Sequence, residues 1–504
     1  MMKFHKNWQI LRFALVFVLL PFSANAQSYN GVFGSNYNNN YNVRINPTAI
    51  GNSKNFLEIS IFDANAYFNS NYLYFKDVSS PFLVLAGKEK LKFPSMGNAG
   101  DFIIKPDLRI DIYGSVEVHG PSFTLTYGRH SFAFSNSFKT ILDGRFVNKL
   151  YGYFVSDLAE MQELAQDYNN GIATGATVVD QNAYPLAYEF LASRIGKQKG
   201  GMMMYGEVSL TYNYSFSNKF DFFTVGGSLK PNIGLHYYGI SATAKENFKP
   251  YPDEITWASS TPILGGKYSK FSQSGLGLGL DFGFTWYRME DDAFHYNPHY
   301  SKDEITDSRR YRCQVMDYKY KLGISLLDVG FTSFKGTYAV IKSPMLLQGL
   351  AGGGDISSVL NQDVRLANIT AMLATAFSVQ FDYKFFDHFY LNTTLIQSFP
   401  QAHPGISRPS LLAVSPRYET KWFEASLPVT LLDWRAPQVG LFLRFYNVSF
   451  GFDNLFQWYN PVNGISGISA YMQITAALSN HPACKPYLSK KGWRKGFKYN
   501  SYAS

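Results

Sequence analysis

Cysteine, charge and long apolar runs are all scarce in this sequence. Its 504 residues contain two cysteines, Cys313 and Cys484, which are too few to staple a chain of this length with disulfides. Charged residues make up 16% of the chain, below the roughly 25% of soluble domains. The apolar run at residues 13–20 is shorter than a membrane-spanning helix requires. The composition excludes a disulfide scaffold and gives no support to a helical membrane protein.

Catalytic and cofactor motifs are missing as well. No G-x-S-x-G, H-E-x-x-H or paired C-x-x-C pattern occurs in the chain. The glycines of residues 275–283 (GLGLGLDFG) do not fit the dinucleotide-binding fingerprint, because that pattern opens a helix and this one alternates like a strand. We therefore predict a protein that is not an enzyme and that uses no cofactor and no metal.

One polar stretch keeps a chemical alternative open. Carboxylate and imidazole groups lie close together at Glu290, Asp291, Asp292, His295 and His299. Such groups bind divalent ions or activate water, but their spacing here matches no fixed ligand pattern. We interpret residues 291–307 as a long solvated loop, and a hydrolase based on Asp291, Asp292 and His295 is the weaker hypothesis.

Aromatic residues are abundant, and the positive charge is confined to the chain ends. Phe and Tyr number 43 and 36, and aromatic residues make up 17% of the sequence. Of the net charge of +9, three charges lie within residues 1–26 and six lie after residue 480. The body of the chain is thus nearly neutral, and we predict no nucleic-acid partner.

The N-terminus has the pattern of a signal peptide. Lys3, Lys6 and Arg12 precede the apolar run, and Ala24-Asn25-Ala26 offers a small-residue cleavage site. We expect residues 1–26 to be removed and the chain to be exported.

Several segments alternate strictly between apolar and polar residues, which predicts β-strands. The clearest are residues 207–214, 276–286, 377–385 and 470–478. The alternation of apolar and polar residues changes phase at two places, Gly128-Arg129-His130 and Tyr446-Asn447. Such a change predicts tight antiparallel hairpins.

Export, aromatic apolar faces and isolated charges on the opposite faces favour a transmembrane barrel over a soluble sandwich. We predict an all-β, antiparallel transmembrane β-barrel of about 14 strands in the cell outer membrane, in contact with membrane lipid. The candidate lumen-facing polar residues are Asp281, Asp382, Lys384 and Arg444. Residues 147–167 and 345–367 are predicted to form long, partly helical loops. Long loops of such barrels lie outside the cell, and short turns lie in the periplasm.

The stretch NVRINPTAIGN, residues 42–52, precedes the first strand pattern. Within it, RINPTAIGN resembles the N-terminal Asn-Pro-Ala motif of long-chain fatty-acid transporter (FadL-like) barrels, with Thr48 in place of the first Ala. The resemblance implies a hatch inside the lumen that includes Arg44, Asn46, Pro47 and Gly51. We expect a plug at residues 27–54, a barrel at residues 55–480 and a basic periplasmic tail at residues 481–504, with Arg44 paired to Asp281 or Asp382.

Three further segments resemble an uncharacterised Bacteroidetes-type outer-membrane barrel family of unknown function. These are residues 119–138 (HGPSFTLTYGRHSFAFSNSF), 412–429 (LAVSPRYETKWFEASLPV) and 440–456 (GLFLRFYNVSFGFDNLF). That family is similar in style to the PorV and PorP barrels linked to type 9 secretion, and it has no assigned activity.

These observations lead to two hypotheses of different classes. The first is passive transport or binding of a small hydrophobic molecule, based on the hatch-like segment and the weakly charged aromatic wall. The alternative is a non-enzymatic accessory or scaffold subunit of a secretion or assembly complex. That alternative depends on the basic, aromatic tail at residues 481–504, which is suited to a periplasmic or envelope protein partner.

Overall fold

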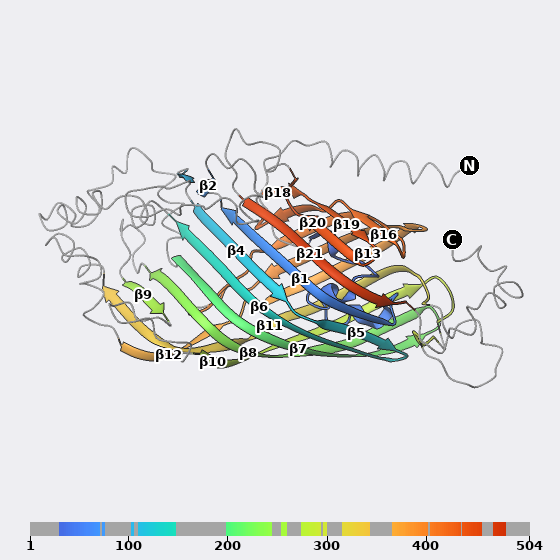
Figure 1. The fold of residues 1–504 in the computed structure, drawn as a ribbon, viewed down its shortest axis with the longest axis horizontal. Coiled ribbons are helices and arrows are strands. Elements are labelled where there is room, and N and C mark those ends of the chain that lie inside the picture. The colour runs from blue at the N-terminus through green and yellow to red at the C-terminus, as the bar shows by residue number, and fades with distance from the viewer. Residues whose placement is uncertain are drawn as a thin grey trace, which may run out of the picture.

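A computed structural model gives the arrangement of the chain (Figure 1). The structure describes residues 30–70, 73–75, 102–104, 109–147, 198–243, 254–259, 274–293, 296–299, 315–342, 365–401, 404–434, 436–455 and 467–479. The predicted signal peptide, both predicted helical loops apart from their end residues, both cysteines, His295 and the basic tail lie outside these residues. In the part described, no helix is long and apolar enough to cross a membrane.

Three short helical turns come first in the chain, and strands follow. The turns are η1 (Asn30–Val32), α2 (Asn39–Asn42) and η2 (Ala49–Asn52). The first strands are β1 (Leu57–Ser70), β4 (Arg109–His119), β5 (Ser122–Tyr127), β6 (His130–Val147), β7 (Gln198–Asn218), β8 (Asp221–Thr243), β9 (Glu254–Ser259) and β10 (Ser274–Met289). A separate two-stranded sheet pairs β2 (Leu73–Phe75) with β3 (Phe102–Ile104).

The second half of the wall continues in the same way. Its strands are β11 (Tyr318–Lys342), β12 (Arg365–Met372), β13 (Ala376–Phe386), β14 (Phe389–Ser398), β15 (Leu411–Glu419), β16 (Phe423–Ser426), β17 (Val429–Leu432), β18 (Ala436–Val439), β19 (Leu441–Phe445), β20 (Val448–Phe452) and β21 (Gly467–Leu478).

Within the described residues, these strands close into a barrel of 14 antiparallel staves. A stave is one position around the wall. The main sheet has 19 strand segments, and in five cases two consecutive segments lie end to end in the same stave, namely β4/β5, β9/β10, β12/β13, β16/β17 and β18/β19. The last strand, β21, pairs with β1 from Leu57↔Leu478 to Asn69↔Gly467, which closes the wall. Closure leaves no free sheet edge, as a hydrocarbon environment demands. The predicted fold class and strand number are confirmed.

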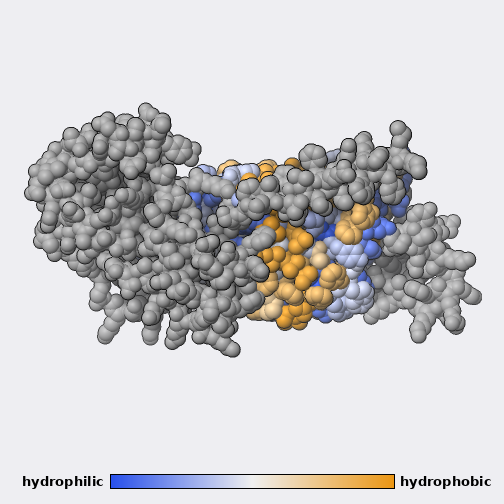
Figure 2. Space-filling view, turned by 90° about the horizontal axis from the view of Figure 1, so that it is seen from above, coloured by the Kyte–Doolittle hydropathy of each residue, from blue (hydrophilic) through white to orange (hydrophobic). Residues whose placement is uncertain are grey.

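The alternation predicted from the sequence separates the two faces of the wall. In β10, Leu276 and Phe282 are exposed by 75% and 53%, whereas Asp281 and Thr285 are buried on the lumen side. The predicted hairpins also form, with turns at Gly128-Arg129 and Tyr446-Asn447. Figure 2 shows apolar side chains gathered on the outer wall and hydrophilic residues toward one end. The outer surface therefore suits lipid.

The two ends of the barrel differ in their connections. Two-residue turns at 128–129, 219–220, 387–388 and 446–447 define the turn end, and the opposite end is called the loop end. Residues 290–317, which include the predicted solvated loop, join β10 to β11 at the turn end. A long loop was expected at the opposite end. This one is held by backbone hydrogen bonds to the short turns, from Gly128 N to Pro298 O and from Ala293 N to Lys219 O.

Candidate functional site

The N-terminal segment, residues 30–56, lies inside the barrel and is almost entirely buried (Figure 1). It contains nine asparagines, whose side chains carry both donors and acceptors. Its helical turns are too short to satisfy their own backbone groups, so the wall supplies partners. Asn30 N donates to Asp453, Asn36 N to Glu419, and Asn39 N and Asn40 N to Glu58. Lumen-facing carboxylates thus hold the segment from several sides.

Apolar contacts anchor the same segment. Val32, Phe33, Tyr41 and Ile45 pack in one buried cluster with wall residues. The wall residues of this cluster are Ala376, Ile396, Leu411, Ala413, Leu432, Phe442 and Tyr471. The segment is therefore packed against the wall as well as hydrogen-bonded to it.

Asn46 and Pro47 lie against β10 and its neighbours. The Asn46 side chain donates to Thr285 Oγ1 at 3.0 Å and to Gln380 Oε1 at 2.8 Å, and it accepts from the Thr48 backbone. A side chain at Gly283 would meet Asn46 and Pro47 at 2.4–2.9 Å, so glycine at this lumen-facing position lets the turn approach. Asn46 is only 3% exposed, as expected for a turn that points into the lumen rather than for a turn on the surface.

Gly51 is equally confined. A Cβ atom there would lie 2.4 Å from the Thr224 side chain and 2.5 Å from the Asn213 side chain, both on the lumen face. Backbone and wall therefore touch at this point, and a larger residue would displace η2.

Arg44 pairs with Asp63 of β1 at 2.5 Å, and its guanidinium lies 4.7 Å from the centre of the Tyr41 ring. The predicted pairing with Asp281 or Asp382 is wrong. β1 begins shortly after the N-terminal segment, so its own lumen-facing carboxylate lies nearest. Asp281 and Asp382 are held by other cations.

Asp382 and Arg444 belong to the turn-end network, which we define as Lys321, Asp382, Arg417, Glu419, Glu424 and Arg444. Arg417 is fully buried and lies 2.9 Å from both Asp382 and Glu419. It also donates to Phe33 O of the N-terminal segment at 3.2 Å. Arg444 pairs with Glu424 at 2.9 Å, and Glu424 accepts from Ser35 Oγ at 2.8 Å.

The N-terminal segment contributes two titratable groups to this end. Burial raises the pKa of Tyr37 well above its usual value, and the ring stacks under the Arg444 guanidinium at 5.0 Å. Burial lowers the pKa of Lys54 to about 8, although the lysine pairs with Asp317 of the 290–317 loop. Lys384 pairs with Asp317 at 3.0 Å and with Glu290 at 3.2 Å. Lys384 thus fastens the loop to the wall.

Asp281 belongs to a second group of charges, nearer the middle of the lumen. Lys230 lies 2.5 Å from Asp281 and 2.8 Å from Asp328, and Arg408 also pairs with Asp328. The Asp328 backbone donates to Asp281 at 2.7 Å across a bulge in the β10–β11 ladder. Asp328 has a φ of 51°, which few non-glycine residues adopt, and the carboxylate contact offsets that strain.

A cavity of about 150 Å³ lies between the N-terminal segment, this charge group and the wall. Titratable residues lining it are Arg44, Glu117, His119, Lys139, Glu207, Lys230, Asp328 and Arg408. Aromatic residues lining it are Phe33, Tyr41, Tyr67, Tyr113 and Tyr205. Aliphatic residues complete the lining, among them Val43, Ile45, Ile141, Leu142, Ile396 and Leu411, so the space in the lumen has both charged and apolar walls.

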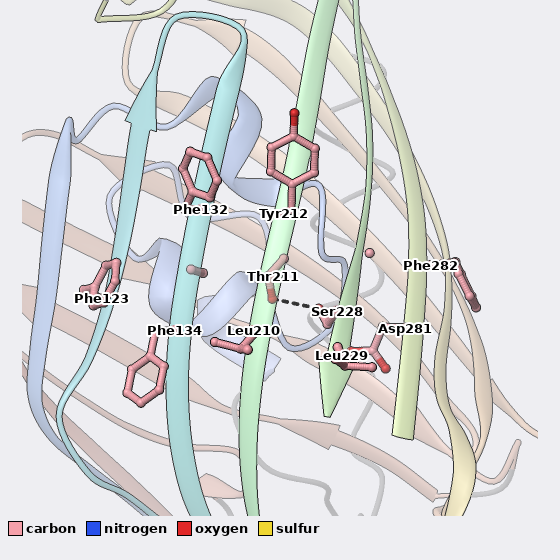
Figure 3. A pocket seen from close by; sticks show the side chains of 12 residues that line it. Phe123, Phe132, Phe134, Leu210, Thr211, Tyr212, Ser228, Leu229, Asp281 and Phe282 are labelled. Carbon is pink, nitrogen blue, oxygen red and sulfur yellow. Dashed lines mark hydrogen bonds between the residues drawn. The ribbon is translucent and has the colours of Figure 1, made fainter. Parts of the chain in front are cut away.

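An apolar groove of about 550 Å³ lies on the outside of the wall (Figure 3). It is centred on Gly227, an outward position of β8 opposite Phe282 of β10. Its apolar lining is Phe123, Phe132, Phe134, Leu210, Tyr212, Leu229 and Phe282. Glycine is required here because a Cβ atom would lie 2.8 Å from Asp281 O.

Of the three residues of the hydrolase hypothesis, the structure describes Asp291 and Asp292, and His295 lies outside the described residues. Asp291 and Asp292 are exposed, and His299 is buried with Nε2 2.9 Å from Ser53 O and its ring against Phe56. Within the described residues, no group of three or more His, Cys, Asp and Glu side chains is placed to hold a metal. His299 instead connects the loop to the N-terminal segment.

Sequence reasoning found Asp281, Asp382, Lys384 and Arg444 but missed most of their partners. Glu58, Glu117, Glu207, Glu419 and Glu424 all face the lumen and are buried or nearly so. The available signal was a carboxylate at one of the alternating strand positions that face the lumen, as in Glu207 of the 207–214 pattern. The density of asparagines in residues 36–42 also indicated a buried polar segment.

The chain belongs to DUF5723, a family of unknown function. The family model matches residues 47–453. This match confirms the predicted resemblance to an uncharacterised family. No curated protein matches the chain.

Two solved structures show how far the likeness extends beyond the family. A Pseudomonas aeruginosa FadL homologue is 10% identical, with 92% of this chain and 100% of that chain covered and a TM-score of 0.38. The Pseudomonas putida toluene transporter TodX is 8% identical, with coverages of 89% and 97% and a TM-score of 0.40.

Proposed function

We propose that this protein is an outer-membrane barrel that passes or holds a small molecule, with the N-terminal segment as its gate. The observation that carries the proposal is a lumen filled by residues 30–56 of the same chain. The apolar outer wall favours a lipid bilayer, and the even number of staves puts both chain ends on one side, the periplasmic turn end.

The contacts of the segment suit a gate. Outside the apolar cluster, it is held by hydrogen bonds and ion pairs, which water replaces when the segment moves. Arg44–Asp63, Ser35–Glu424 and Asn46–Gln380 are of this kind. The net worth of each such bond is about 0.5–1.5 kcal/mol, since water competes for the same groups. A segment held in this way can be displaced without unfolding the wall.

A disulfide between gate and wall tests the proposal. Thr48 Oγ1 and Thr285 Oγ1 lie 2.6 Å apart, so cysteines at both positions bring their sulfurs within bonding reach. In a Cys313→Ser, Cys484→Ser background, we expect oxidised Thr48→Cys/Thr285→Cys protein to block solute flux into liposomes. Reduction should restore the flux of the wild type.

A second disulfide gives a matched control. Thr211 Oγ1 and Ser228 Oγ lie 2.7 Å apart on neighbouring wall strands, so Thr211→Cys/Ser228→Cys crosslinks the wall without holding the segment. Its flux should not respond to oxidation. Equal flux through the oxidised and the reduced Thr48–Thr285 protein would overturn the gate.

The outer groove and the lumen cavity differ in the kind of solute that each can hold. The hydrophobic molecule proposed from the sequence has a matching surface in the apolar groove around Gly227, which faces the membrane. The cavity of the lumen combines charged side chains with aromatic and aliphatic ones. A lipid-like molecule thus fits the outer groove, and a solute with both polar and apolar parts fits the lumen.

The accessory-subunit hypothesis depends on residues 481–504, which lie outside the described residues. It stays a prediction from the sequence, together with the periplasmic or envelope partner that it implies.

A further inference from the structure

A short segment of the chain joins opposite sides of the lumen near the loop end. Residues 404–410 lie in the connection from β14 to β15, and we call them the bridging segment. The path around the wall from β6 to β15 passes through β7, β8, β10, β11, β13 and β14, which is seven of its 14 steps. β6 and β15 therefore face each other across the barrel.

The bridging segment is bound to the side of the wall from which it starts. Ile406 N donates to Met372 O at 3.2 Å, and Met372 N donates to Pro404 O at 3.3 Å, at the end of β12. The Ile406 side chain is fully buried in a cluster of wall residues from β7, β8, β9, β11 and β12. The Arg408 guanidinium pairs with Asp328 of β11. Backbone, apolar and ionic contacts thus act together on this side.

The opposite side of the wall binds the same segment through three charged residues of β6 and β7. Ser407 N donates to Asp143 Oδ2 at 2.9 Å. Lys199 Nζ donates to Ser407 Oγ at 2.5 Å, and Arg145 donates to Arg408 O at 3.2 Å. Both cations also lie within ion-pair distance of Asp143, at 3.6 Å for Arg145 and 3.8 Å for Lys199. The bridging segment therefore spans the lumen from wall to wall.

The end of the segment is held by the turn between β17 and β18. Ser410 N donates to Asp433 Oδ1 at 2.8 Å, and Asp433 N donates to Ser410 O at 2.7 Å. The Tyr113 hydroxyl of β4 donates to Asp433 Oδ2 at 2.8 Å. Asp433 has a φ of 44°, a conformation that persists in a non-glycine residue only when its surroundings hold it. These contacts connect the segment to a third part of the wall.

The lumen cavity lies between the bridging segment and the N-terminal segment. Ser407, Arg408 and Pro409 line it from one, and Tyr41 and Arg44 are among the residues that line it from the other. The two segments differ in how they are attached. Residues 30–56 continue into the wall only through β1, whereas residues 404–410 are tied at both ends, to β14 and β15. A segment tied at both ends and bound on both sides has little freedom to open.

We propose that the bridging segment is a fixed constriction, which limits the size of the solute that the barrel passes once the N-terminal segment has moved. The inference rests on the proposed function and deepens it, since the gate controls when a solute passes and the constriction controls which size passes. A cavity of about 150 Å³ holds about five groups the size of water, at roughly 30 Å³ each. The limit should therefore lie near a four-carbon polyol.

Flux of uncharged solutes into liposomes that contain the full chain tests the size limit. The wild type should pass erythritol at least tenfold faster than sucrose. Deletion of residues 404–407 removes the contacts of Ile406 and Ser407. It leaves β14 and β15 joined by a shorter connection, and these strands pair directly at Ile396↔Leu411. The two fluxes should then agree within threefold. Equal fluxes in the wild type, or an unchanged ratio in a deletion variant that runs as a compact band on unheated detergent gels, would overturn the inference.

A disulfide distinguishes a fixed constriction from a second gate and covers the case in which the deletion variant does not fold. Met372 and Gly405 are partners in a parallel bridge, where neighbouring backbones lie about 4.8 Å apart, within the span of a disulfide. In the Cys313→Ser, Cys484→Ser background, oxidation of Met372→Cys/Gly405→Cys should leave erythritol flux unchanged. The Thr211→Cys/Ser228→Cys wall crosslink is the matched control. Loss of erythritol flux in the first protein alone would show a segment that must move.

Hydrogen exchange supplies a readout that needs no transport. The Ser407 amide should exchange at least tenfold more slowly than the amides of the exposed turn at residues 387–388, and Ile406→Gly should remove this protection. Equal exchange at the two places in the wild type would contradict a fixed segment. A flux switch by the Thr48–Thr285 disulfide without size discrimination would refute this inference alone. Size discrimination without the switch would refute the gate alone.

Discussion

Arg417 is the residue on which the contacts of the turn end converge. It neutralises Asp382 and Glu419 and donates to Phe33 O of the N-terminal segment. The parity of its strand predicts that it faces the lumen, but no local pattern identifies its partners. Glu419 lies two positions along the same strand, but Asp382 comes from β13 and Phe33 O from the segment, and only the closed barrel brings these to Arg417. Arg44 shows the same limit of prediction from sequence. Its charge and its motif predicted a lumen partner, but only the fold shows that this partner is Asp63.

Replacing Arg417 should be among the most damaging single changes. Arg417→Leu leaves buried carboxylates without their cation, which typically costs about 3–5 kcal/mol. We expect a correspondingly lower free energy of unfolding in urea with lipid vesicles. Arg417→Lys keeps the charge but not the paired geometry of the guanidinium. Its free energy of unfolding should lie between those of the wild type and Arg417→Leu. A change of less than 1 kcal/mol in Arg417→Leu would mean that the network adds little to stability.

At the scale of elements, the strands and hairpins follow from the sequence and the position of one loop does not. The alternation of apolar and polar residues correctly predicted which side chains of residues 276–286 and 377–385 point outward. The reason is that one face of each strand contacts lipid and the other face contacts the lumen. Length and polarity alone placed residues 290–317 among the outer loops. Their contacts with the short turns and with residues 52–54 are long-range and leave no local pattern.

Tyr296 should control how firmly this loop covers the N-terminal segment. Its hydroxyl donates to Asn52 Oδ1 at 2.7 Å and accepts from Met316 N at 3.1 Å. Tyr296→Phe leaves both groups unpartnered, at about 1–3 kcal/mol. We expect faster hydrogen exchange of the backbone amides of residues 50–56. Tyr446→Phe, at a residue that is 50% exposed, is the control. Equal exchange in both variants would contradict a covering role.

At the scale of the whole molecule, closure through β1 and β21 determines whether the barrel exists. Ala66 pairs with Ala470 of β21 on one side and with Val116 of β4 on the other. Proline at this position removes a ladder donor on whichever side its N–H faces, at several kcal/mol in hydrocarbon. We expect Ala66→Pro to reduce the fraction of protein that runs as a compact band on unheated detergent gels. Ala66→Val should run like the wild type, and unchanged mobility of Ala66→Pro would contradict this role of the seam.

The seam also has a consequence for assembly. The segment that fills the lumen leads directly into β1, and β21, the last strand among the described residues, seals the wall beside it. Residues 30–56 join β1 at the turn end, so the segment is attached beside the seam whether it enters the lumen before or after closure. The residues that fill the interior are therefore covalently tied to one side of the seam, and an assembling barrel keeps its own plug within reach of the opening at every stage.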